Sequence, residues 1–135
     1  MSYPITDIEG IDRDVAAILK SAGIRSTARL LEQARTVKGR KALAAKTGID
    51  EKRLLCWANM ADRMRVKGVS KEYAELLQAA GVDTVKELKY RNPCNLTEAM
   101  AEANRKRKLV RLLPSEKHVV RWIDHARKLP LKITY

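Results

Sequence analysis

The feature that most constrains the fold of this chain is an internal repeat. A shift of 58 positions places residues 7–34 over residues 65–92, so that glycines, alanines and leucines coincide. The identical pairs include Gly10 and Gly68, Ala16 and Ala74, Leu19 and Leu77, Ala22 and Ala80, Gly23 and Gly81, and Leu30 and Leu88. A duplicated unit of about 60 residues is typical of stacked helical repeats.

A second shift, of 65 positions, continues the repeat toward the end of each copy. It places Trp57 on Trp122 and aligns the apolar residues around them. The seven-residue difference between the two shifts predicts an insertion in the second copy, around Asn92–Leu113. The sequence therefore predicts one compact domain over the whole chain, built from two copies, residues 1–64 and 65–135.

Two amphipathic helices joined by a very short turn are predicted between Asp50 and Gly81. The first helix carries apolar residues at intervals of three and four, and Asp50 precedes it as a candidate N-cap. The second helix starts behind Ser70 and can end at Gly81, where glycine permits a left-handed conformation. We name the turn hairpin two (residues 65–70) and its equivalent in the first copy hairpin one (residues 7–12); each contains one glycine.

The sequence of hairpin two resembles the helix-hairpin-helix family of non-specific DNA-binding motifs. In that family the hairpin reads hydrophobic–x–Gly–hydrophobic–Gly, and the following helix carries an early alanine. Val66, Gly68, Val69 and Ala74 match this motif, whereas Ser70 stands where the second glycine is usual. Over nearly its whole length, the chain also resembles a bacterial family of tandem helix-hairpin-helix proteins without an assigned function. The resemblance implies an all-helical fold and contact with DNA through a hairpin.

The fold class expected from these signals is all-α, with about eight short helices. Abundant alanine and leucine with only 4% aromatic residues favour helix over strand. The expected helices cover residues 12–22, 26–35, 39–47, 50–65, 70–80, 84–91, 96–108 and 115–128. Breaks are expected at Asn92–Pro93 and at Pro114. Both ends of the chain are expected to be extended, and one hypothesis is that they pair as a short two-stranded ribbon.

The charge of the chain favours a polyanionic partner. Lysines and arginines outnumber acidic residues 28 to 16, which leaves a net charge of +12. Such an excess fits nucleic acid first and an anionic membrane second, and the alternative is a basic surface that serves only solubility. The densest basic cluster comprises Arg105, Lys106, Arg107, Lys108 and Arg111, inside the predicted insertion. This cluster is either part of a binding surface or a solvated helix face.

Several other functions are not supported by the sequence. No apolar run reaches the roughly 18 residues needed to span a bilayer, and the start of the chain is acidic where a secretory signal is basic, so a cytoplasmic location is expected. Cys56 and Cys94 lack metal-binding spacing, and His118 and His125 are seven residues apart, so no metal or cofactor is expected. No catalytic motif is present, and we expect a protein that is not an enzyme.

The two hairpins differ in their fitness to hold a phosphate. Amides at a helix N-terminus and the helix dipole attract anions, and glycine lets the backbone approach closely. Hairpin one is acidic, and a carboxylate cap at Asp12 would occupy the amides that a phosphate needs. Hairpin two has Arg65, Lys67 and the following Lys71 around Gly68, so only hairpin two is expected to bind. The alternative is a purely structural role, in which Gly68 serves only to make a compact turn.

We therefore expect non-sequence-specific binding of double-stranded nucleic acid, with DNA favoured. The candidate contact residues are Arg65, Lys67, Gly68, Val69, Ser70, Lys71, Arg105, Lys106, Arg107, Lys108 and Arg111. The alternative is a helical-repeat adaptor that docks an acidic protein partner. No membrane contact is expected, and the sequence carries no signal for an oligomeric state. Trp57 and Trp122 are expected in the core rather than as stacking platforms for single strands.

Overall fold

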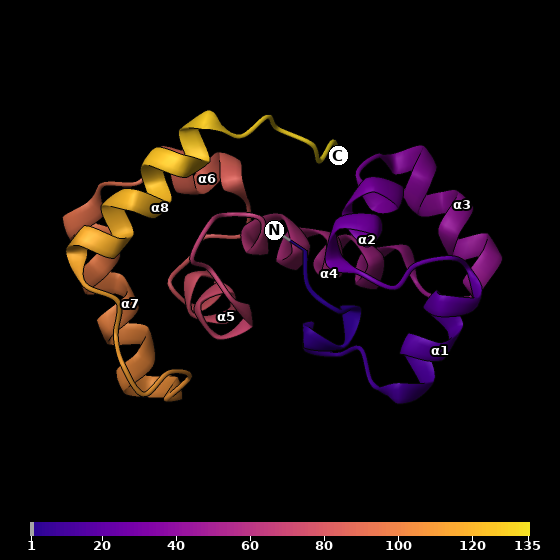
Figure 1. Cartoon of the computed structure of the whole chain (residues 1–135), viewed down its shortest axis with the longest axis horizontal. Helices are drawn as coiled ribbons and strands as arrows, with labels where there is room; N and C mark the ends of the chain where they lie inside the picture. The colour runs from indigo at the N-terminus through magenta and orange to yellow at the C-terminus, as the bar shows by residue number, and fades with distance from the viewer. Residues whose placement is uncertain (1) are drawn as a thin grey trace. The chain divides into compact units, whose positions relative to one another are not determined.

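The structure is a computed structural model that describes residues 2–135, and over these residues the chain is all-α with eight α-helices (Figure 1). The helices are α1 (Arg13–Ser21), α2 (Thr27–Ala34), α3 (Val37–Thr47), α4 (Glu51–Met64), α5 (Lys71–Ala79), α6 (Val85–Lys89), α7 (Pro93–Arg107) and α8 (Glu116–Lys128). The predicted fold class is confirmed, and each helix begins and ends within three residues of its expected bounds. None of these helices is both long and apolar enough to cross a bilayer.

Two local predictions were wrong. Pro93 was expected to lie in a break between two helices, but it is the first residue of α7. The helix starts here because Asn92 caps it by accepting from the Asn95 N–H at 3.0 Å. Proline is well tolerated at this position, since its missing N–H would have no partner there. The N-terminal segment was expected to be extended, but residues Ile5–Asp7 form a 3₁₀ helix, η1, that buries Ile5 completely.

The hypothesis of a ribbon between the two ends was also wrong. Pro4 bridges Ser26, and the Thr134 N–H donates to the Arg35 carbonyl at 2.7 Å. Each end therefore satisfies its backbone groups at a different end of α2, and no ribbon forms within residues 2–135. The residues after α8 lack helical structure, as expected.

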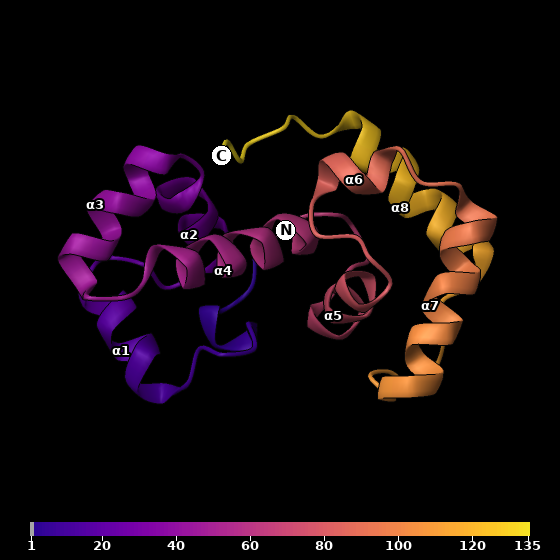
Figure 2. The same ribbon diagram turned by 180° about the vertical axis from the view of Figure 1, so that it is seen from behind.

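The chain forms two compact units. The first contains residues 2–65 together with residues 132–135, and the second contains Val66–Leu131. In the first unit, α2 packs on both α3 and α4; in the second, α8 packs on both α6 and α7, while α5 packs on α7 (Figures 1 and 2). The boundary falls within one residue of the boundary expected between the two copies.

Each unit packs its glycine turn on a tryptophan. Gly10 and Gly68 have φ of 95° and 91°, a region that side chains other than glycine rarely adopt. A Cβ atom built on Gly10 would lie 3.2 Å from Nε1 of Trp57, and one built on Gly68 would lie 3.1 Å from Nε1 of Trp122. Both tryptophans are only 4% exposed, which confirms their predicted place in the core. The two units thus share the same internal contact.

The predicted insertion lies between α7 and α8. After the 58-residue shift, α7 extends two residues beyond the end of α3. The following loop has eight residues, 108–115, where the loop after α3 has three, 48–50. The basic cluster therefore occupies the end of α7 and a loop that has no full counterpart in the first unit.

Residues 132–135, which we call the tail, are held by a buried arginine of the first unit. Arg40 is 5% exposed; its Nη1 donates to the Ala34 carbonyl at 2.9 Å and its Nη2 to the Thr134 carbonyl at 2.7 Å. Tyr135 adds a hydrogen bond from its hydroxyl to Asn59 at 3.2 Å. Arg40 is therefore a structural residue, although the sequence places it in a basic stretch with Lys38.

We predict that Arg40→Met destabilises the first unit by about 1.5–3 kcal/mol, because one buried and one part-buried carbonyl lose a charged donor. Methionine preserves much of the aliphatic volume, so the loss reports the hydrogen bonds rather than a cavity. Urea unfolding measures the change, and hydrogen exchange at the Thr134 amide should accelerate. An exposed Lys38→Met change is the control, and equal stability of the two variants would contradict the prediction.

Candidate functional site

Hairpin two is rigid on its inner side and basic on its outer side. Val66 and Val69 are completely buried, and the Val69 N–H donates to the Val66 carbonyl at 3.0 Å. Lys67 and Lys71 are exposed, and Gly68 lies between the two valines at the surface. Val69 therefore shapes the turn without offering its amide to a ligand.

The first turn of α5 differs from that of α1 in its capping. In α1 the Asp12 carboxylate accepts from the Val15 N–H at 2.9 Å. In α5 the equivalent residue, Ser70, is half-buried and its hydroxyl caps no helix amide. The N-terminal amides of α5 thus have no side-chain acceptor at the Ser70 cap, and the one acidic residue of the first turn is Glu72.

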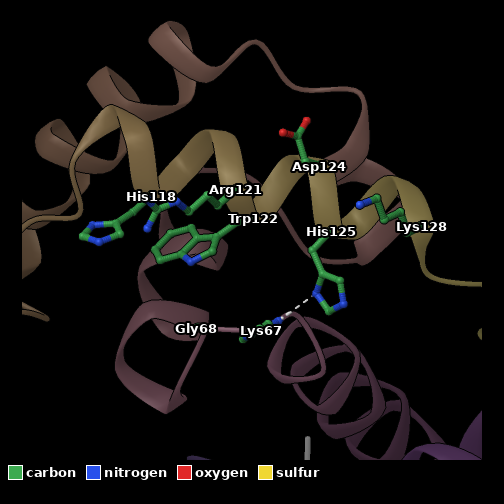
Figure 3. Close-up of a pocket in the computed structure, with 8 residues that line it drawn as sticks. All are labelled: Lys67, Gly68, His118, Arg121, Trp122, Asp124, His125 and Lys128. Carbon is green, nitrogen blue, oxygen red and sulfur yellow. Dashed lines mark hydrogen bonds between the residues drawn. The ribbon is translucent and has the colours of Figure 1, made fainter.

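An open groove of about 540 Å³ lies between hairpin two and α8, within the second unit (Figure 3). His118, Arg121 and His125 extend from α8 into this groove, with Trp122 at its base. Its lining consists of Lys67, Gly68, His118, Arg121, Trp122, Asp124, His125 and Lys128. We call it the hairpin–α8 groove.

A hydrogen bond joins the two sides of the hairpin–α8 groove. The Lys67 backbone N–H donates to Nδ1 of His125 at 2.9 Å. Because an amide can only donate here, Nδ1 must carry no proton, and His125 is the neutral tautomer with its proton on Nε2. The side chain of His125 thus occupies a hairpin amide that lies at the edge of the groove.

The balance of charge in the groove is positive. Lys67, Arg121 and Lys128 are cationic, and Asp124 is the one carboxylate among the lining residues that the structure describes. Figure 3 shows the Asp124 carboxylate pointing away from the hairpin, and Arg127 neutralises it at 3.5 Å. The groove therefore presents three cations and two imidazoles on one concave surface, an arrangement suited to an oxyanion.

The first unit does not reproduce this surface. The 65-residue shift places Cys56 at the position of Arg121 and Met60 at the position of His125. Met60 is buried, and its sulfur contacts Nη2 of Arg63 at 3.1 Å. Both units pack a glycine turn on a tryptophan, and in the first unit Arg53 lies over the Trp57 ring at 4.9 Å. What the first unit lacks is a counterpart of Arg121 and of His125.

The basic cluster separates into two residues that pair with Glu102, which are Arg105 and Lys106, and three that do not, which are Arg107, Lys108 and Arg111. Arg105 donates to Glu102 at 2.6 Å, and Lys106 lies 3.7 Å from the same carboxylate. The hydrogen bonds from Arg105 hold the pKa of Glu102 below its usual range. Arg107, by contrast, is an exposed residue at the end of α7, where basic side chains also suit the helix dipole.

The remaining two cluster residues, Lys108 and Arg111, lie against the first turn of α5. They line a second open groove, of about 630 Å³, together with Glu72 and Tyr73. The Tyr73 hydroxyl donates to the Leu112 carbonyl at 3.1 Å, which fixes the loop there. The ring of Tyr73 also lies 5.2 Å from that of Trp122, so this second groove and the hairpin–α8 groove adjoin one aromatic pair.

Arg65 is placed differently from the other hairpin residues. Its Nε donates to Oδ1 of Asp62 at 2.7 Å, and its side chain is 11% exposed. It belongs to the first unit, as the residue that follows α4. We therefore leave Arg65 out of the surface that a ligand could reach.

Comparison with known proteins gives one match. The family model described as a domain of unknown function (DUF4332) matches residues 9–129 of the chain. The chain belongs to the DUF4332 family. No curated protein and no solved structure shows a significant match to it. Gly10, Gly68 and the hairpin–α8 groove all lie inside the DUF4332 match, whereas the tail lies beyond it.

The prediction from sequence missed the residues that α8 contributes to the hairpin–α8 groove. His118, Arg121, His125 and Lys128 follow one another at intervals of three, four and three, which places them along one side of a helix. This spacing was a usable signal. The spacing of the two histidines does not fit a metal site, which drew attention away from this side of the helix. Within residues 2–135, no group of side chains that could hold a metal gathers around them.

Proposed function

We propose that this chain binds double-stranded DNA through the phosphate backbone, without reading its sequence. In this proposal the two glycine turns are helix-hairpin-helix units, and the second one carries the binding function. The observation that supports the proposal most strongly is the hairpin–α8 groove. Two elements that are far apart in the sequence contribute cations to its lining, and Figure 3 shows the carboxylate of Asp124 pointing away from the hairpin.

The proposed contacts differ from those expected from sequence alone. Lys67, Gly68, Ser70 and Lys71 remain, and Arg121 and Lys128 join them on α8. Arg107, Lys108 and Arg111 extend the surface past the first turn of α5. Val69 is excluded because it is buried, and Arg65 because its side chain is only 11% exposed and is paired with Asp62. Arg105 and Lys106 contribute less because Glu102 compensates their charge.

Binding of this kind is driven by release of counterions from DNA, so the affinity depends steeply on salt. About five neutralised phosphates would give a slope of log K against log salt concentration near −4 to −5. Fluorescence anisotropy with duplexes of increasing length and unrelated sequence tests the proposal. Equal affinity for all sequences and this slope are the expected results, whereas affinity independent of salt would count decisively against it.

The second candidate function is a protein adaptor. Hairpin one carries Asp7 and Glu9, and Asp14 follows in the first turn of α1. Leu112 in the inserted loop is 77% exposed, so both a charged and an apolar contact surface exist. Pull-down from a nuclease-treated lysate separates the candidates. A stoichiometric protein partner that survives nuclease treatment would favour the adaptor.

The uncapped start of α5 gives a prediction in which stability and binding change in opposite directions. Ser70→Asp should stabilise the second unit by about 0.5–1 kcal/mol, because a carboxylate can cap α5 as Asp12 caps α1. The same carboxylate should weaken duplex binding several-fold by repelling phosphate.

Thermal unfolding and anisotropy measure the two effects of Ser70→Asp. Ser70→Ala is the control, since it adds neither a cap nor a charge. Weaker binding by both variants to the same extent would contradict the prediction.

A further inference from the structure

We propose that binding at the hairpin–α8 groove is coupled to the uptake of one proton by His125. This inference rests on the proposed function, because it concerns the phosphate that would enter the same groove. The neutral imidazole of His125 accepts the Lys67 amide at the edge of the groove in the free protein, and its protonated form helps to hold the phosphate in the complex.

The free state is defined by the bond between His125 and the hairpin. Nδ1 accepts the Lys67 N–H at 2.9 Å, which only an unprotonated Nδ1 can do. The free protein therefore has its hairpin amide satisfied and its imidazole uncharged. An imidazolium in this place would bring its own N–H against the amide N–H, and the bond would be lost.

The charged side chains that line the groove with His125 are mostly cationic. The charged and titratable side chains that line the groove are Lys67 from the hairpin and His118, Arg121, Asp124 and Lys128 from α8. The helices packed around them, α5, α6 and α7, contribute no residue to this lining. Three cations surround the imidazole, and the one carboxylate points away and pairs with Arg127.

A phosphate in the groove would change the contacts of His125. Its negative charge offsets the cations, and its oxygen can replace Nδ1 as the acceptor of the Lys67 N–H. His125 is then released from the amide and, once protonated, can donate its own N–H to the phosphate. In this exchange an N–H bond forms at Nδ1 with a proton that hydronium in the solvent gives up, and a phosphate oxygen replaces Nδ1 as the acceptor of the Lys67 N–H.

The sign of the pH dependence follows directly. Because the complex binds one more proton than the free protein, affinity rises as pH falls through the range in which histidine titrates. One linked proton changes affinity by at most about tenfold per pH unit. We expect duplex affinity to be about tenfold higher near pH 5.5 than near pH 7.5, because the proton is only partly linked across this interval.

The test compares two variants of the full chain by anisotropy with a duplex of random sequence at constant salt. In His125→Asn the amide oxygen can still accept the Lys67 N–H but cannot take up a proton, so less than about a twofold change with pH is expected. His118→Asn is the matched control, because His118 lines the same groove without bonding to the hairpin. The chain has only these two histidines, and the His118 variant should keep the pH dependence of the wild type.

The outcomes separate this inference from the proposed function. If the His125 variant keeps the wild-type pH dependence, the inference is overturned while nucleic-acid binding stands. Absence of binding at low salt at every pH would overturn both. Nitrogen NMR of the imidazole gives a second measurement: Nδ1 should be unprotonated in the free protein and protonated in the complex near pH 6.5. A neutral His125 in that complex would overturn the inference as well.

Discussion

Neutralising Lys67 and Arg121 together is expected to weaken duplex binding about 60-fold at 0.1 M salt. The estimate follows from counterion release, in which each lost phosphate contact removes about 0.9 from the slope of log K against log salt concentration. At this salt concentration two contacts correspond to a factor of about 60. The two residues lie on opposite sides of the hairpin–α8 groove, one on the hairpin and one on α8.

The variant Lys67→Gln with Arg121→Gln tests this effect, and a salt titration should show a slope smaller in magnitude by about two. Both side chains are exposed, so the fold should be preserved. Lys38→Gln with Lys41→Gln is the matched control, because it removes the same charge from exposed positions on α3 of the first unit. An equal loss in both double variants would show that net charge, and not the groove, governs binding.

Gly68→Ala is expected to destabilise the second unit by about 2–5 kcal/mol. About 1–2 kcal/mol comes from the positive φ, which an alanine Cβ disfavours. The remainder, about 1–3 kcal/mol, comes from overpacking, since the new Cβ would lie 3.1 Å from Nε1 of Trp122, a buried side chain that cannot move aside freely.

Gly23→Ala separates the two contributions. Gly23 has a similar φ of 86°, but nothing lies within 4 Å of the Cβ that alanine would add there. Urea unfolding followed by circular dichroism should therefore give a loss of only about 1–2 kcal/mol for Gly23→Ala. Equal losses in the two variants would show that the contact with Trp122 carries no part of the effect.

The helices of this protein were predictable because their signals are local. Asp12, Asp50 and Ser115 each accept from an amide in the first turn of the helix that they precede. Gly48 adopts the left-handed conformation at the end of α3. Periodic apolar residues between such caps determine a helix without reference to the rest of the chain. The one proline misplaced in the prediction, Pro93, occupies a helix start, where proline is compatible with helix.

The side-chain contacts between elements were harder to predict from the sequence, because they depend on how the helices pack. The bond between Lys67 and His125 joins residues 58 positions apart, and the one between Arg40 and Thr134 joins residues 94 positions apart. No local pattern distinguishes Arg40, which is buried, from its neighbour Lys41, which is exposed. Basic composition alone therefore overestimates the number of cations free to meet a ligand.

The candidate site also combines features that the local sequence predicts with features that depend on packing. The contrast between an acidic and a basic hairpin is a property of sequence, and the different capping by Asp12 and Ser70 is consistent with it. The contribution of Arg121 and His125 required the packing of α8 against the hairpin turn. The compensation of Arg105 by Glu102, one helical turn away, could have been anticipated from the spacing of three residues.

The attachment of the tail to the first unit has a consequence for the cooperativity of unfolding. The chain passes into the second unit at Val66 and leaves it after Leu131, and both flanking segments belong to the first unit. If the second unit unfolds, its 66 residues become a flexible loop whose ends remain pinned. Closing a loop of that length costs on the order of 4 kcal/mol in entropy. Unfolding of the second unit should therefore detach the tail from Arg40, so that these four residues couple the unfolding of the second unit to the stability of the first.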